Sequence, residues 1–293
     1  MFELLEKFIW LLVQALLMLA LAPLFSGILH TVKAILLNRV GSSIFQPYFN
    51  IRKWMQKAVV ITPDTSWVFL AAPFIYFFSV LVATAMLPNL KVSFNFGDIF
   101  VFFSILAFGR FFMTLSSLDA GTAFGGMGGS REIFISVLVE PTLYLSVIAA
   151  TIKAEGTNID SLASAITATN FNIATILACI AFFATILAEN SRIPVDNPTT
   201  HLELTMIHET MVLEYSGFMV ALIELASMLK MFLFVCLFSY IFLPLAISIV
   251  VKVLITLILI ALTESLNNKM RLFKAPTYMA ASIVLLILAV VAQ

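Results

Sequence analysis

The sequence predicts an all-α, polytopic membrane protein with about eight transmembrane helices, one of them strongly tilted, and an amphipathic helix at the membrane interface. Hydrophobic residues make up 62% of the 293 residues, charged residues make up 11%, and the mean hydropathy is +1.09. This is more apolar surface than the core of a water-soluble domain of this size can bury. We therefore expect a single integral membrane domain over residues 1–293.

The first apolar stretch follows the slightly acidic residues 1–7 and is long enough to cross a bilayer. A secretory signal would have a basic start and a shorter apolar core, so this stretch is interpreted as the first membrane helix. A hydrocarbon layer of roughly 30 Å needs about 20 apolar residues per helix. We expect membrane helices near residues 8–29, 66–88, 98–118, 132–152, 171–189, 212–243, 245–264 and 276–292.

The sixth stretch, residues 212–243, is too long for a straight span. At about 1.5 Å per residue it would extend well beyond the hydrocarbon layer, so we expect it to be strongly tilted, broken or partly outside lipid.

Two segments between the expected spans have distinctive composition. Residues 44–60, IFQPYFNIRKWMQKAVV, alternate apolar and basic side chains at roughly helical spacing, which predicts the amphipathic helix at the interface. Residues 121–129 are rich in glycine but lack the lysine and the preceding strand of a phosphate-binding loop. Close helix packing or a mobile turn is the expected role of this glycine-rich segment.

Lysine and arginine are divided unevenly between the two sides of the expected bundle. Most lie in the loops expected at 30–65, 110–131, 190–211 and 265–275. The other side has only Lys7, Lys91 and Lys153. The positive-inside rule therefore places the four basic segments in the cytoplasm and both termini outside, in a multi-pass protein of the cell inner (cytoplasmic) membrane.

Several charged residues fall inside or just beneath the expected bilayer. Glu140 lies nine residues into the fourth expected helix, and Glu189 ends the fifth. Glu214 and Glu224 follow in the sixth, with Glu224 near the expected midplane and Lys230 beyond it. A lone carboxylate at such a depth costs several kcal/mol unless it is neutral or paired.

Two interpretations of these charges stay open. Burial brings proton exchange by glutamate and lysine closer to neutral pH, so a row of such groups is suited to a proton relay. Alternatively, the groups are hydrogen-bonded fixtures that hold the helices together. On the relay interpretation, Lys230 is the expected point at which the path passes to a neighbouring subunit.

The composition argues against several other functions. The net charge is zero and there is no long basic run, so nucleic-acid binding is excluded. Cys179 and Cys236 stand alone in apolar runs, without the spacing of a zinc, iron–sulfur or disulfide site. His201 and His208 with Glu203 suggest a metal site, but their spacing fits no tight ligand set, and a polar interface is the stronger interpretation. We expect no cofactor in this chain.

Several motifs, in order along nearly the entire chain, resemble one family. These motifs are AENSRIPVD at 188–196, Glu203-Leu204, Glu214-Tyr215, Arg39-Val40-Gly41, Gln46-Pro47, Lys53 and KMRLFK at 269–274. They resemble the quinone-site membrane subunit, subunit 1, of respiratory complex I. GGSRE at 128–132 and Glu140-Pro141 resemble most closely the membrane subunits of group 4 [NiFe] hydrogenases of the formate hydrogenlyase and hydrogenase-4 type.

The resemblance implies a coupling subunit that links a cytoplasmic redox arm to antiporter-like membrane subunits. The expected partners are hydrogenase-like large and small subunits and a ferredoxin-like subunit, which would carry the [NiFe] centre and the iron–sulfur clusters. The implied proton path consists of Glu140, Glu189, Glu203, Glu214, Glu224 and Lys230. The expected interface with the redox arm consists of Arg39, Gln46, Lys53, Arg131, Arg192, Asp196, His201 and His208.

Departures from the family pattern bear on quinone use. Quinone-using relatives carry an aspartate where this chain has Asn50, and a glutamate where it has His201. These differences make quinone doubtful and favour a hydrogenase-type complex. The alternatives are a quinone-chamber subunit of an NADH or related quinone oxidoreductase and, with less support because no inverted repeat is visible, a free-standing ion transporter.

Overall fold

The computed structural model describes residues 2–62, 65–88, 97–152, 156–168, 172–197, 206–243 and 247–292. Every regular element in these ranges is helical. The elements are α1 (Phe2–Leu36), α2 (Gln46–Met55), α3 (Trp67–Thr84), α4 (Ile99–Asp119), α5 (Ala123–Thr151), α6 (Ile159–Ala168), α7 (Ile173–Glu189), α8 (His208–Val212), α9 (Phe218–Phe242), α10 (Ile249–Leu266), the 3-10 helix η1 (Leu272–Lys274) and α11 (Ala275–Val291).

Side-chain caps fix where three of the long helices begin. Ser66, Asp98 and Thr122 have extended backbone and accept hydrogen bonds from amide groups in the first turns of α3, α4 and α5, respectively. Such caps satisfy amide donors that a helix start otherwise leaves without partners. With Thr122 as the cap of α5, the turn between α4 and α5 is only three residues long.

Seven of the described helices are long and apolar enough to cross a membrane, namely α1, α3, α4, α5, α9, α10 and the helical run Leu272–Val291. Helix α7 is apolar and 17 residues long. The chain is thus a multi-pass, all-α membrane protein, as the sequence predicts, although the count of eight spans is approximate. The predicted interfacial helix corresponds to α2.

The start of α5 differs clearly from the sequence prediction. Helix α5 begins at Ala123 rather than near 132, because most of the glycine-rich segment is helical. A Cβ atom on Gly128 would lie 3.0 Å from the backbone of Met211 and one on Gly129 would lie 2.4 Å from Ser117 Oγ, so these glycines allow close packing. The segment 110–131 is therefore helical apart from the turn at 120–122. The prediction of a loop over this segment is wrong.

The long sixth stretch is broken, which was one of the predicted outcomes. Helix α8 ends at Val212 and α9 begins at Phe218. Gly217 precedes α9 with φ +56°, a conformation that favours glycine. Because α9 begins so late, Lys230 lies at its middle, and Glu224, which was expected near the midplane, lies in its first two turns.

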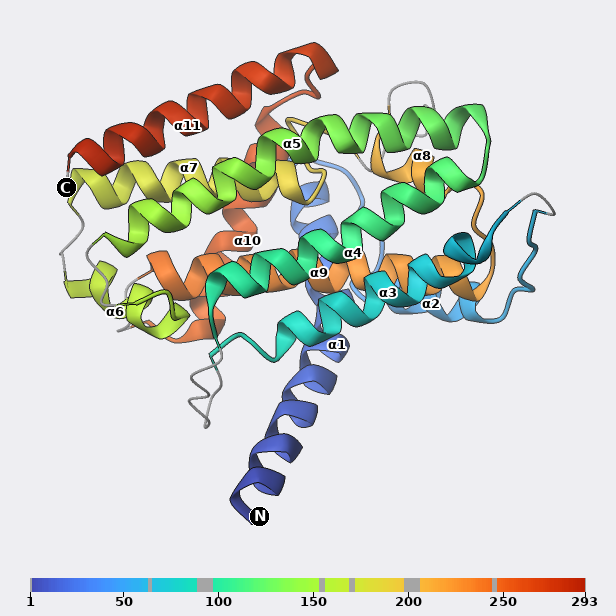
Figure 1. Cartoon of the computed structure of the whole chain (residues 1–293), viewed down its shortest axis with the longest axis horizontal. Helices are drawn as coiled ribbons and strands as arrows, with labels where there is room; N and C mark the ends of the chain where they lie inside the picture. The colour runs from blue at the N-terminus through green and yellow to red at the C-terminus, as the bar shows by residue number, and fades with distance from the viewer. Residues whose placement is uncertain are drawn as a thin grey trace.

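Helix α9 forms the centre of the bundle. In the most apolar 18-residue stretch of α9, 83% of the residues are buried, against 17% in that of α1. Helices α3, α4, α5, α7, α9 and α11 run roughly along the long axis of the molecule, whereas α1 crosses them and its N-terminal half stands clear of the bundle (Figure 1). Phe102, Phe182 and Phe234 are fully buried between α4, α7 and α9.

Contacts between loops divide the molecule into two ends. At one end Met270 N donates to Pro194 O over 2.8 Å, and Ser216 Oγ donates to Val60 O over 3.0 Å. At the other end Ile159 N donates to Gly97 O over 2.9 Å. Segments that the sequence analysis assigned to one side of the membrane thus contact each other.

Candidate functional site

Four charged side chains form a continuous row inside the bundle, here called the ion-paired row. It consists of Glu140 on α5, Arg110 on α4, Glu189 at the end of α7 and Lys230 on α9. Arg110 is buried and its two terminal nitrogens form ion pairs with Glu140 and Glu189. Arg110 was expected in the cytoplasmic loop 110–131, which is wrong because α4 runs without interruption from Ile99 to Asp119.

Glu189 is the most heavily contacted member of the row. Its second carboxylate oxygen lies 2.8 Å from Lys230 Nζ, and Lys230 also donates to the Glu189 main-chain carbonyl over 2.9 Å. The side chain is 2% exposed. Two cations therefore stabilise this buried carboxylate. A buried charge is costly unless opposite charges or hydrogen bonds compensate it.

Glu140 is the end of the row that reaches the surface. Its side chain is 40% exposed, whereas those of Arg110 and Lys230 are 7% and 8% exposed. Glu140 lies near the middle of α5, so it faces sideways from the bundle rather than toward a helix end. Glu140 rather than Lys230 is thus the member of the row that reaches the surface of the chain.

A cavity of about 90 Å³, here called the small cavity, adjoins the buried end of the row. Its polar lining includes Arg110, Glu132, Glu189, Asp196 and Lys230. A further void of about 10 Å³ touches Glu140, Arg110 and Glu189 on the other side. The row therefore connects the small cavity with the lateral surface.

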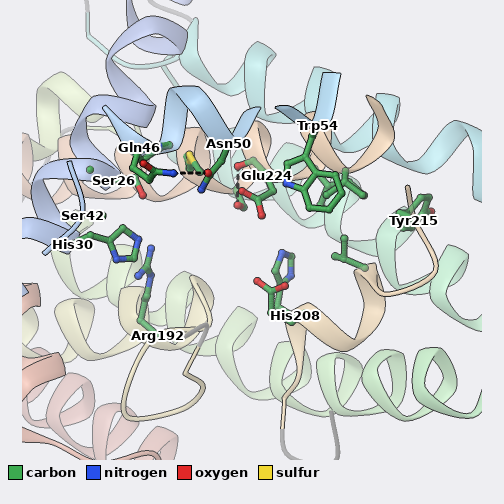
Figure 2. Close-up of a pocket in the computed structure, with 18 of the residues that line it drawn as sticks. Ser26, His30, Ser42, Gln46, Asn50, Trp54, Arg192, His208, Tyr215 and Glu224 are labelled. Atoms are coloured by element: carbon green, nitrogen blue, oxygen red, sulfur yellow. Dashed lines mark hydrogen bonds between the residues drawn. The ribbon is translucent and has the colours of Figure 1, made fainter. Parts of the chain in front are cut away.

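A larger cavity of about 550 Å³, here called the large cavity, lies between α1, α2, α8 and α9. Figure 2 shows His30, Arg192, His208 and Glu224 pointing into the same space. Gln46 Nε2 donates to Asn50 Oδ1 over 3.0 Å at its upper side (Figure 2). The side chains that line both cavities are Arg192, His208, Glu209, Ser227 and Met228. The two cavities are thus neighbours along one route.

Asp196 orders the segment between the cavities. This buried carboxylate forms an ion pair with Lys269 at 2.6 Å and accepts hydrogen bonds from the amides of Ile207 and His208 at 3.0 and 3.4 Å. Burial lowers the pKa of His208 below its ordinary value of 6.5, with Lys230 and Arg192 acting in the same direction and Glu209 and Asp196 opposing them. The neutral imidazole can therefore both donate and accept a hydrogen bond at neutral pH.

Glu264 on α10 ties two basic residues to the same region. Its carboxylate lies 2.9 Å from Lys33 Nζ and 3.4 Å from Arg192 Nη1. Arg131 Nη1 donates to the Met206 main-chain carbonyl over 2.9 Å. Arg131 and Arg192, two of the three arginines expected at the redox-arm interface, thus also anchor the chain around the cavities.

The remaining predicted site residues do not all gather here. Arg39 and Lys53 are exposed, and Glu214 is half-buried and lines neither the large nor the small cavity. His201 and Glu203 lie outside the described residues. Within the described part of the chain, no three His, Cys, Asp or Glu side chains are grouped to hold a metal ion.

Four site residues were missed by the sequence reasoning, namely Arg110, Glu132, Glu209 and Glu264. Arg110 offered a signal, because ILAFGRFFMTL at 105–115 carries a single charge in an apolar run. Glu132 and Glu264 lay near expected helix ends, where a charge needs no special explanation.

The fold and these buried groups define the class of the protein: a polytopic, all-helical membrane subunit with charged side chains and polar cavities inside the bundle. The chain belongs to the NADH dehydrogenase family, whose model matches residues 8–293, and within it to the complex-I-like membrane subunits.

Individual relatives agree with this assignment. Hydrogenase-4 component C of Escherichia coli (strain K12) is 34% identical over 240 residues, which cover 80% of this chain and 75% of that protein. Formate hydrogenlyase subunit 4 of the same organism is 32% identical over 285 residues, which cover 90% of this chain and 92% of that protein. A chain of the membrane-bound sulfane sulfur reductase, an archaeal respiratory membrane complex, has the same fold, with a TM-score of 0.83, 17% identity and coverage of 98% of this chain and 100% of that one.

Proposed function

We propose that this chain anchors a [NiFe]-hydrogenase-type redox arm to the cytoplasmic membrane and couples electron transfer in that arm to proton or sodium translocation. The relatives support the kind of complex, since both are components of hydrogen-metabolising assemblies by name. In such an assembly the [NiFe] centre and iron–sulfur clusters belong to partner subunits, and antiporter-like subunits lie beside this one in the bilayer.

The observation that carries the proposal is the uninterrupted series of polar cavities and ion pairs through the bundle. The large cavity, with Glu224 and His208, shares its wall with the small cavity, whose lining includes Glu189 and Lys230. The ion-paired row then continues through Arg110 to half-exposed Glu140. Groups that exchange or reorient protons at successive short distances are what a conduction path inside a low-dielectric bundle requires.

The orientation follows from charge. The end with the basic segments 37–66 and 267–274 faces the cytoplasm, where it receives the redox arm, and both termini lie outside. Arg39 and Lys53 are exposed at this end and are suited to contacts with acidic groups of a partner. Gln46, Arg131, Arg192, Asp196 and His208 then support the contact from beneath.

A quinone chamber is the second candidate, because the large cavity falls within the size range of small-molecule sites. Asn50 at its wall is an amide where quinone-using relatives carry an acid, which favours the quinone-free complex. A quinone-binding titration of the intact complex separates the two candidates.

The test of coupling uses the purified whole complex in proteoliposomes with Glu140→Gln and Glu224→Gln combined. Glutamine keeps size and hydrogen bonding but cannot exchange a proton, so translocation is expected to fall by roughly tenfold or more. Electron transfer to an artificial acceptor in the redox arm is expected to persist. Translocation is followed with a pH-sensitive dye and with radioactive sodium.

Glu6→Gln is the matched control, because Glu6 is an exposed glutamate near the start of α1, away from both cavities. It is expected to leave translocation and electron transfer unchanged. Wild-type translocation by the Glu140→Gln, Glu224→Gln complex would show that these carboxylates have no coupling role.

A further inference from the structure

Glu132 is a buried carboxylate that the ion-paired row leaves without a cation. It lies on α5 and is 5% exposed. Its Oε2 atom has no hydrogen-bond partner among the described residues, and none of the ion pairs in that part of the chain includes it. Among the buried side chains of the described segments, it is the one whose carboxylate oxygen is left in this state.

Such an oxygen is costly to bury unless it binds water or carries a proton, by about 1–3 kcal/mol for a neutral group and more for a charged one. The small cavity that Glu132 lines is large enough to hold water, which can hydrogen-bond to this oxygen or deliver a proton to it. Its volume is about 90 Å³. One water occupies about 30 Å³ of liquid, so the small cavity has room for about three. Arg110, Glu189 and Lys230 supply polar groups in the same wall.

Glu189 is poorly suited to change charge, although it is the buried acid of the row. Glu189 contacts both Arg110 and Lys230, so protonating it would leave two buried cations with less compensation. A carboxyl group that gains and loses a proton at lower cost is one without such contacts, and Glu132 faces the same water-sized space.

We propose that Glu132 is the proton-loading carboxyl of this subunit, connected by water in the small cavity to the Glu189–Lys230 pair on one side and to His208 and Glu209 on the other. A proton delivered by water from the large-cavity side forms an O–H bond at Oε2. The same proton then leaves to water beside the ion-paired row, and no electron moves in this step. The inference rests on the proposed function and names a carrier in its path.

The sharpest test replaces Glu132 by glutamine and, separately, by aspartate in the whole complex. E132Q is expected to assemble, to keep electron transfer in the redox arm and to lose translocation by roughly tenfold or more. E132D keeps an exchangeable carboxyl and is expected to recover part of the translocation. Glu6→Gln again serves as the control.

A spectroscopic measurement separates proton loading from a structural role. The infrared difference spectrum between the resting and the reduced wild-type complex is expected to contain a carboxylic-acid C=O band that shifts in D₂O. This band should be missing in E132Q and displaced in E132D. If E132Q does not assemble, the infrared spectrum of E132D is the test. A band unchanged from that of the wild type would then overturn the proposal.

The outcomes distinguish this inference from the proposed function. If E132Q translocates like the wild type while the Glu140→Gln, Glu224→Gln complex does not, the coupling function stands and the role of Glu132 is refuted. If neither variant loses translocation, the proposed function itself fails.

Discussion

Arg110 shows at the scale of a single residue how charge is accommodated inside this bundle. Its guanidinium contacts Glu140 and Glu189, which come from two other helices. A planar group with donors on two terminal nitrogens can hold two carboxylates apart while donating hydrogen bonds to both, which a lysine ammonium does less well. Removing it would leave two acids near each other in a poorly hydrated space.

Arg110→Leu is therefore expected to destabilise the complex by about 3–5 kcal/mol, the usual cost of leaving buried charges without their partner. The measurement is the thermal unfolding midpoint of the purified complex, together with its yield. Arg110→Lys should lose less stability. Adding Glu140→Gln to Arg110→Leu should restore part of the loss, and the absence of any restoration would contradict the pairing described here.

The sequence was informative about the acids and less so about their partners. Glu140, Glu189, Glu224 and Lys230 stand out because each interrupts an apolar helix, and all four line the cavities or belong to the row. Which cation meets which acid depends on the rotation and tilt of whole helices, which hydropathy does not specify. Arg110 falls within the expected helix 98–118 but was counted with the loop 110–131, so its place inside the bundle was missed.

At the scale of elements, close backbone approach fixes the wall of the large cavity. A Cβ atom at Gly27 on α1 would lie 1.8 Å from the main-chain carbonyl oxygen of Ile44. That carbonyl belongs to the segment that leads into α2, and Ser42 and Gln46 on either side of it line the large cavity. The position of α2 over the large cavity thus depends on a residue without a side chain.

Gly27→Ala is expected to push the segment around Ile44 away from α1 and to cost about 1–3 kcal/mol, as overpacking usually does. Gly126→Ala is the matched control, because a Cβ there meets nothing within 4 Å and alanine favours the helix. Thermal unfolding of the two purified variants checks the difference. Equal midpoints for both would contradict the close approach.

Elements were predicted well where apolar length alone decides them. Helices α3, α4, α7, α10 and α11 lie close to their expected positions. Helix α6 was not expected, because its ten residues alternate small polar and apolar side chains and are too few to span. The break before α9 was left open by the sequence, since it depends on Gly217 packing against the carbonyls of Lys57 and Ala58.

At the scale of the whole molecule, the two ends of the bundle should face opposite sides of the membrane. Single cysteines at Ser42 and Asn268, both exposed at the basic end, are expected to react with an impermeant maleimide only in inside-out vesicles stripped of peripheral subunits. A cysteine at exposed Asn172 should react only in right-side-out vesicles. The opposite labelling pattern would reverse the orientation, and with it the face that receives the redox arm.

The lateral position of Glu140 also has a consequence for a cell that makes this subunit before its partners. The proposed path ends at Glu140, at the side of the bundle rather than in either aqueous phase, so lipid would block it until another protein covers it. A copy of this subunit without its partners would then leak no ions, and the membrane potential would be maintained during assembly. Docking of the neighbouring subunit would both complete the complex and allow ions to pass.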